Sequence, residues 1–186
     1  RFREAGDLLH EVVQVQPLGE YAIAEGDAYR AAGDDAAAEE AYGLVGAITD
    51  LYRANGVDVD LELALFEADR DPNDRSLAAA RRALEDRPSI IGHDVVAWNL
   101  HRRGRDDDAA EHMAEALATG SRDPLLRFHA AAIAAGRGDR EAAREHLGVV
   151  LDSNPRFSAG HVDEVRDLAE ELGLAMPPPP PCDTCP

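Results

Sequence analysis

The sequence predicts an all-α solenoid of antiparallel helix hairpins that ends in a capping helix. Alanine and leucine dominate the apolar residues, and aromatic residues make up only 5% of the 186 residues. Clusters of β-branched residues are scarce, which favours helices over strands. Glycines interrupt the helical spacing of apolar residues at a repeating interval. Gly104 and Gly138 lie 34 residues apart and have the same pattern around them, which is typical of stacked repeats.

The first predicted unit, residues 1–18, is the second helix of a hairpin whose first helix would lie upstream. Ala5, Leu9, Val12 and Pro17 occupy the positions that apolar residues and proline occupy in the second helices of the later hairpins. The chain also begins inside a helical pattern, without a methionine or a signal-peptide pattern. We therefore expect that its natural N-terminus has been removed.

Four hairpins are predicted next, at residues 19–56, 57–89, 90–123 and 124–157. Each combines two helical apolar patterns with a short break, and a glycine in the break supplies the positive φ that a tight turn between helices often needs. The first hairpin has a long second helix that is predicted to end at a C-cap at Asn55-Gly56. In the second hairpin, Asp71-Pro72 replaces the glycine break.

Residues 158–173 are predicted to form a single amphipathic helix. Its apolar stripe contains Val162, Val165, Leu168 and Leu172, and acidic residues cover its other faces. A helix with a polar back is what a solenoid needs to cover its last hairpin, so we interpret it as the C-terminal cap. Five consecutive prolines follow in residues 174–186, which we expect to be a disordered or independently mobile tail.

The 34-residue interval and its pattern of small, aromatic, alanine and proline residues resemble the tetratricopeptide repeat (TPR) family. The segments LYRANGVDVDLELALFEADRD and LLRFHAAAIAAGRGD...NPRFS are similar to the C-terminal half of long bacterial TPR proteins of poorly defined role, and this similarity covers residues 3 to 173. The resemblance implies a right-handed superhelix in which the first helix of each hairpin lines a concave groove. It also implies that the groove binds a protein or peptide.

The register of the resemblance places a set of candidate binding residues on this concave face. They are Asp27, Arg30, Leu65, Asp94, Trp98, His101, Arg102 and Phe128, with Glu20, Ile23, Leu61 and Leu125 as further groove positions. Trp98 either anchors a partner or packs between hairpins as core, and both interpretations stay open. Family members that clamp a terminal carboxylate use lysines and asparagines in the groove. This groove offers only Arg30 and Arg102 as cations, which disfavours such a clamp.

The charge of the chain narrows the class of partner. Thirty-seven acidic against nineteen basic residues give a net charge of -18, which repels phosphate backbones and anionic lipids and so excludes nucleic acid. A basic protein segment is favoured, unless the charge only solvates the outer helix faces. The chain has no apolar run of roughly 18 residues, so membrane insertion is not expected. The oligomeric state and the compartment, cytoplasm or cell envelope, stay open.

Few residues could carry chemistry. Cys182 and Cys185 form one Cys-x-x-Cys in the tail, but no second pair or nearby histidine completes four zinc ligands. A local disulfide, an intermolecular tether and an unstructured end are the alternatives. His112 and His146 occupy equivalent places in successive hairpins, about 8–10 Å apart, which is too far to share one metal ion. No catalytic motif is present, so we predict no enzyme activity, cofactor or metal.

These observations favour a non-catalytic scaffold that binds a protein or peptide on its concave face. Two alternatives remain. In the first, the chain is a metal- or redox-linked accessory module that uses Cys182 and Cys185. In the second, it is a purely architectural part of a larger protein.

Overall fold

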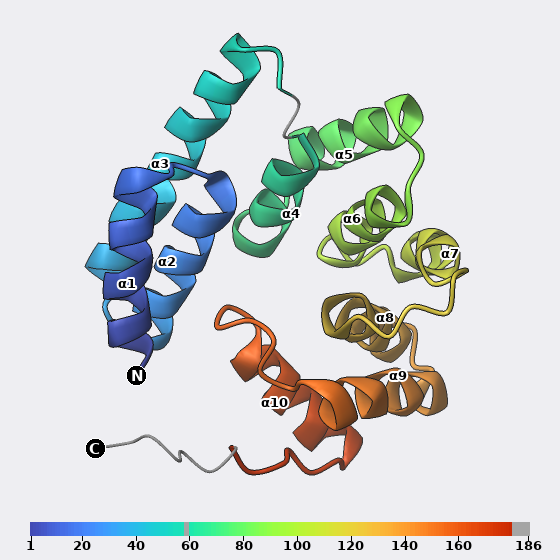
Figure 1. Cartoon of the computed structure of the whole chain (residues 1–186). Coiled ribbons are helices and arrows are strands. Elements are labelled where there is room, and N and C mark those ends of the chain that lie inside the picture. The colour runs from blue at the N-terminus through green and yellow to red at the C-terminus, as the bar shows by residue number, and fades with distance from the viewer. Residues whose placement is uncertain (58–59, 180–186) are drawn as a thin grey trace.

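The computed structural model describes residues 1–57 and 60–179 and shows an all-helical arrangement (Figure 1). These described residues form ten α-helices and no strand, which confirms the prediction of an all-α protein. The helices are α1 (Phe2–Val15), α2 (Gly19–Ala31), α3 (Asp35–Ala54), α4 (Asp60–Arg70), α5 (Asp74–Asp86), α6 (Ile90–His101), α7 (Asp106–Ala116), α8 (Pro124–Gly136), α9 (Arg140–Ser153) and α10 (Val162–Leu172).

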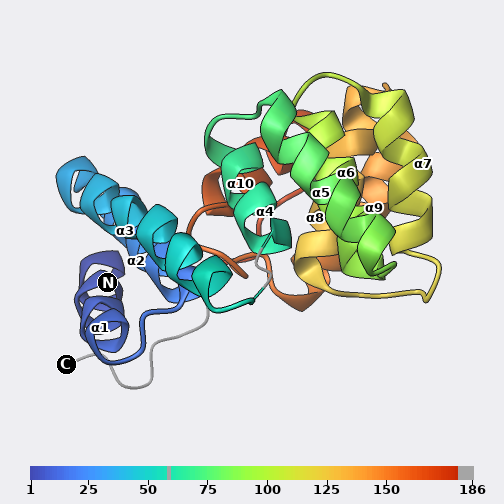
Figure 2. The same cartoon turned by 90° about the horizontal axis from the view of Figure 1, so that it is seen from above.

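Most helices pack against their neighbours in the chain. Helices α2 and α3, α4 and α5, α6 and α7, and α8 and α9 form pairs, while α2, α4, α6 and α8 also contact one another in succession. The pairs follow a curved row with α10 on its inner side (Figure 1). Seen from above, α1 to α3 form one group and α4 to α10 form a second group beside it (Figure 2). We call the side of α2, α4, α6 and α8 that faces α10 and the loop before it the inner face.

Local sequence signals explain where the helices begin and end. Glycines with positive φ form the turns inside three of the pairs, because residues with a Cβ avoid that conformation. These glycines are Gly33, Gly104 and Gly138, with φ of 78°, 71° and 77°. The side chains of Asp34 and Asp139 then accept hydrogen bonds from backbone N–H groups at the starts of α3 and α9. Asn73 does the same for α5, two residues after the predicted break at Asp71.

Small residues let the paired helices approach each other closely. Ala38 and Ala41 of α3 are buried against α2. On α2, a Cβ added at Gly26 would overlap the ring of Tyr42 from α3. In the same way, a Cβ at Gly6 of α1 would meet the ring of Tyr29. The spacing of small residues therefore decides which large side chain each helix can accept from its neighbour.

The apolar core is a series of clusters along the row. One cluster joins α4 to α8, a second joins α8, α9 and α10 with parts of α4 and α6, and smaller clusters join α1 to α4. Leu100, Ile133 and Leu147 are among the largest fully buried side chains. Three of these clusters take their residues from helices that are close in the sequence, whereas the second also joins α4 to α10, which lie far apart in the chain.

The last helix does more than cover α9. Val165, Ala169 and Leu172 of α10 are buried in the same cluster as α9 residues, as a cap requires. The loop between α9 and α10, however, crosses the inner face, which the sequence did not indicate. Residues 174–179, predicted to be mobile, contain Leu174 and Met176, which pack against this cluster because they are apolar. Residues 180–186, with both cysteines, lie outside the described residues.

Candidate binding site on the inner face

The inner face carries a compact group of aromatic side chains. Trp98 of α6 stacks on His129 of α8, with ring centroids 4.0 Å apart and an interplanar angle of 15°. Phe128 lies 5.8 Å from Trp98, and His161 from the loop before α10 meets Phe128 edge-on at 5.5 Å. Phe157 from the same loop lies 6.1 Å from Phe128. Aromatic pairs in such tilted and stacked geometries stabilise a packed site beyond the area they bury.

Trp98 is packed inside this group and is only 1% exposed. Its indole Nε1 donates a hydrogen bond to Oδ1 of Asp69 at 2.6 Å, which satisfies the polar end of the side chain. Of the two interpretations that the sequence left open, the structure therefore shows Trp98 as core between hairpins. A partner on the inner face can touch its edge but cannot enclose it.

Asp69 and His161 form a close pair of ionisable side chains on the inner face. Oδ2 of Asp69 lies 3.6 Å from Nε2 of His161. Burial favours the neutral form of Asp69, but the nearby imidazole of His161 and the hydrogen bond from Trp98 outweigh burial and lower the pKa of the carboxyl group. Burial likewise opposes a charge on His161, but Asp69, Glu164 and Asp27 outweigh it and raise the pKa of the imidazole. The pair thus favours a carboxylate facing an imidazolium.

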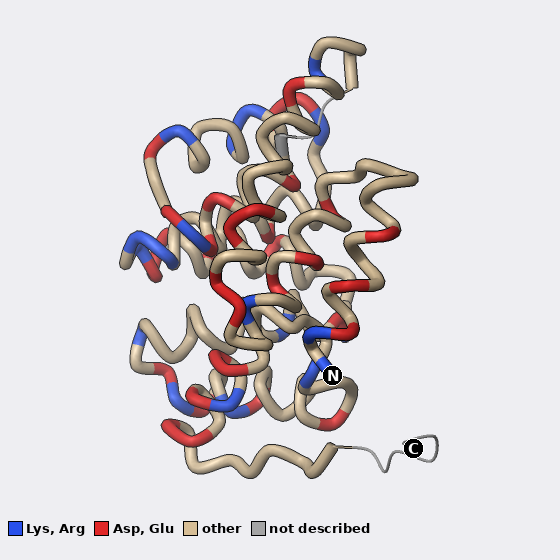
Figure 3. The backbone as a smooth tube through the Cα atoms, turned by 90° about the vertical axis from the view of Figure 1, so that its left-hand side faces the viewer, with Lys and Arg blue, Asp and Glu red and all other residues tan. Residues whose placement is uncertain are grey.

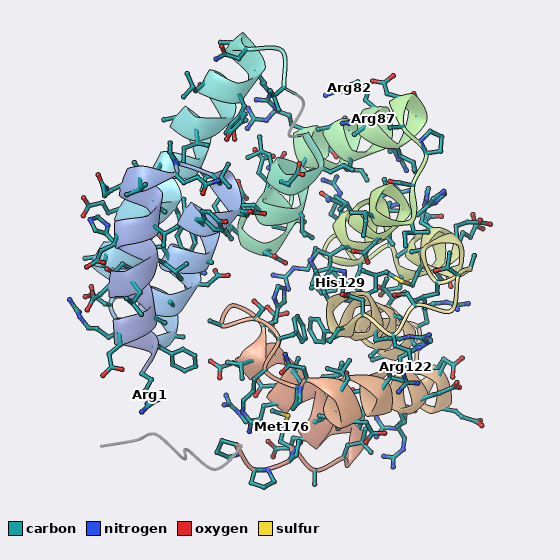
Figure 4. The ribbon with its side chains drawn as sticks, in the orientation of Figure 1. Arg1, Arg82, Arg87, Arg122, His129 and Met176 are labelled. Carbon is teal, nitrogen blue, oxygen red and sulfur yellow. The ribbon has the colours of Figure 1, made fainter. Side chains whose placement is uncertain are left out.

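A second buried pair lies beneath the aromatic group. Nδ1 of His129 and Oδ1 of Asp94 are 2.8 Å apart, and both side chains are almost fully buried. Nε2 of His129 makes no hydrogen bond with any described residue. In Figure 4 His129 lies among the side chains between α6 and α8. Asp94, a predicted binding residue, therefore orients His129 and is not accessible to a partner.

Asp27 of α2 lies at the end of the inner face that belongs to the first hairpin. It accepts a hydrogen bond from the Tyr42 hydroxyl at 2.7 Å, yet burial dominates and raises the pKa of its carboxyl group. A Cβ at Gly160 would lie 2.7 Å from Oδ2 of Asp27, so glycine lets the loop before α10 pass close to α2. Arg30 lies over the Tyr42 ring, with its Cζ 4.8 Å from the centroid. This loop therefore touches the first hairpin of the row as well as the last.

Two hollows remain on the inner face, on either side of Glu164. Between α2, α4 and the loop, a hollow of about 70 Å³ is lined by Asp27 and Arg30 together with His161. Between α6, α8 and α10, a larger hollow of about 380 Å³ is lined by four of the predicted residues. These four are Trp98, His101, Arg102 and Phe128. Arg102 also lies 3.4 Å from Glu164, which tethers α10 above the hollow.

The eight predicted residues thus divide into two groups. Asp27, Arg30, Trp98, His101, Arg102 and Phe128 line the hollows, whereas Leu65 packs partly buried against two core clusters and Asp94 lies below the surface. His101 is also held by Asp106, with Nδ1 and Oδ1 2.5 Å apart. The sequence reasoning missed Asp69, His129, Gly160 and His161. Asp69 lies one helical turn after Leu65 and could have been found by extending the register, but nothing in the sequence indicated the loop residues.

Comparisons with protein-family models, curated proteins and solved structures find no match. We therefore infer a function from the geometry of the inner face alone. Among residues 1–57 and 60–179, no group of three or more histidine, cysteine, aspartate or glutamate side chains is placed to hold a metal ion. No helix in this part of the chain is long and apolar enough to cross a membrane. Cys182 and Cys185 lie outside the described part of the chain.

Proposed function

We propose that the chain is a TPR-like right-handed solenoid that binds a segment of a partner protein on its inner face and catalyses no reaction. Paired helices joined by glycine turns, with successive first helices in contact, support the TPR-like part of this proposal. The buried pairs on the inner face support the binding part. They hold aromatic and charged groups in one geometry before any partner arrives, which lowers the cost of ordering on binding.

The single observation that carries the proposal is the hollow between α6, α8 and α10. Its volume of about 380 Å³ falls in the usual range for sites that enclose a ligand group. Phe128 and Ala132 provide apolar walls, while Glu164 and Glu171 line the α10 side. The hollow therefore suits an apolar or aromatic side chain next to a basic one. The net charge of -18, spread over many helices (Figure 3), favours the same basic partner.

The test fills the hollow without touching the buried pairs. Ala132→Phe places a ring into the space, whereas Ala36→Phe adds the same ring at an exposed position of α3. Both variants and the wild-type 186-residue chain are incubated with an array of basic, aromatic-containing peptides. We expect Ala132→Phe alone to lose at least about 1.4 kcal/mol of binding free energy, a tenfold drop in affinity. Equal binding by all three proteins would contradict the proposal.

A second candidate, an architectural role in a larger array, is favoured by the exposed face of α1. If Pro17 is aligned with Pro155, Val12 of α1 corresponds to Val150 of α9. Val150 is 0% exposed and lies in a core cluster with residues of α8 and α10, whereas Val12 is 40% exposed. Val12→Lys therefore separates the architectural role from the binding role. The variant should keep the thermal stability of the wild type, and it should weaken association with other parts of a larger array only if another helix covers this face of α1.

A further inference from the structure

Two histidines from different helices face each other between α6 and α7. Nδ1 of His93 on α6 lies 3.2 Å from Nδ1 of His112 on α7, and the two ring centroids are 5.4 Å apart. Both residues are only partly buried, so an ion in solution can reach them. From the sequence we compared His112 only with His146, but its close neighbour is this histidine on the other helix of its own pair. The two imidazoles are therefore placed to act together.

Regular helix structure fixes the backbone on both sides of the contact. The N–H of Gly92, next to His93, donates a hydrogen bond to Oγ of Ser89, which caps the start of α6. Met113, next to His112, is buried in the core cluster that joins α4 to α8. Helices α6 and α7 also pack against each other (Figure 1). Side chains on such elements keep a set geometry better than side chains on loops.

The distance between the two nitrogens suits a shared metal ion. Zinc binds imidazole nitrogens at about 2.0–2.1 Å in tetrahedral geometry, which places two bound nitrogens roughly 3.3–3.4 Å apart. The Nδ1 atoms of His93 and His112 are 3.2 Å apart. A neutral imidazole carries one proton, and the nitrogen without it has a free lone pair. Two ligands therefore form when both rings carry this proton on Nε2 and rotate slightly toward one ion.

The next hairpin makes the same contact without a second ligand. Arg127 of α8 lies 34 residues after His93, and its Nη1 is 3.1 Å from Nδ1 of His146 on α9. His146 in turn lies 34 residues after His112. A guanidinium group is always charged and has no lone pair to offer a metal ion. Since arginine satisfies the helix contact at this position, the histidine in the α6–α7 pair adds a metal-binding nitrogen that packing does not require.

The surroundings of the pair favour a metal that binds nitrogen. Asp108 and Glu111 of α7 attract a cation near His112, whereas Arg81 of α5 repels it. Asp108 is also held by Arg105, whose Nε lies 2.8 Å from its Oδ2. Charge alone therefore does not concentrate hard cations such as calcium, which need six or more oxygen ligands. Imidazole nitrogens suit zinc, copper and nickel instead.

We propose that His93 and His112 chelate a divalent transition-metal ion between α6 and α7, and that water completes its coordination. The site goes beyond the proposed peptide binding, because neither histidine lines a hollow of the inner face. A third protein ligand is not required, in keeping with the finding that no group of three or more such side chains in residues 1–57 and 60–179 is placed to hold a metal. The bound ion joins the two helices and stabilises the folded chain by mass action.

The test uses zinc and the 186-residue chain with Cys182→Ser and Cys185→Ser, because thiolates bind zinc on their own. Titration calorimetry measures zinc affinity, and thermal unfolding with and without zinc measures stabilisation. His93→Arg copies the contact of the next hairpin and removes one ligand, so it should fold normally. His112→Gln removes the other ligand. His146→Gln is the matched control, because it changes the equivalent histidine of the next hairpin, whose neighbour is no ligand.

We expect one zinc ion per chain and a loss of affinity of at least about tenfold in both His93→Arg and His112→Gln. The control His146→Gln should bind zinc as the starting chain does. Zinc should raise the unfolding midpoint of these two proteins but not of the ligand variants, and calcium should raise none. Equal zinc binding by His93→Arg would overturn the proposal. The absence of zinc binding once both cysteines are serine would overturn it as well.

Discussion

Gly160→Ala tests the contact between the loop before α10 and the first hairpin. The new methyl group would lie 2.7 Å from Oδ2 and 2.9 Å from Cγ of Asp27. The carboxylate cannot swing away freely, because the Tyr42 hydroxyl holds it at 2.7 Å. Overpacking of this kind costs about 1–3 kcal/mol. The alanine also restricts the unfolded chain, which returns about 0.4–1 kcal/mol, so we expect a net destabilisation between about zero and about 2.6 kcal/mol.

The measurement is a double-mutant cycle in urea unfolding with Gly160→Ala and Asp27→Ala. In the Asp27→Ala background the clash partner is gone, so Gly160→Ala should be neutral or slightly stabilising. The two substitutions should therefore show a coupling energy of about 1–3 kcal/mol. An equal effect of Gly160→Ala in both backgrounds would refute the closeness of this loop to α2. A stabilising effect in the wild-type background would refute it equally.

Three further substitutions test the helix contacts and the inner face. Gly26→Ala should destabilise the fold by about 1–3 kcal/mol because its methyl group overlaps the Tyr42 ring. Gly148→Ala has open space around it and should stabilise α9 by about 0.5–1 kcal/mol. Chemical denaturation measures both free energies of unfolding, and a change of the same sign in the two variants would contradict the packing around Gly26. His161→Asn should destabilise most below pH 6.5, because the raised pKa of His161 adds stability there that is lost as the pH rises through the folded-state pKa. Unfolding at several pH values checks this, and a loss that grows with pH would exclude the Asp69 pairing.

The sequence predicted the parts of the fold that depend on local signals. Helical apolar spacing gave the all-α class. The breaks at Gly33, Gly104 and Gly138 became turns with positive φ because no other residue adopts that backbone conformation as easily. The C-cap at Asn55 was also confirmed, since α3 ends at Ala54. These features need only a few neighbouring residues, so one sequence is enough to find them.

The candidate site was predictable only in part. Repeat register identified Asp27, Arg102 and other residues of the first helices that line the hollows. It could not identify His161 or Gly160, because their position depends on the curvature of the whole row and on the path of one loop.

The loop that passes Asp27 also changes how the row can open. In a linear array each unit touches only its neighbours, so the terminal units fray first. Here Gly160 lies against α2 and His161 against Asp69 of α4, so the beginning and the end of the row share contacts. We therefore expect that loosening the first hairpin also exposes the last, so that backbone amides at both ends exchange with solvent water in the same opening event.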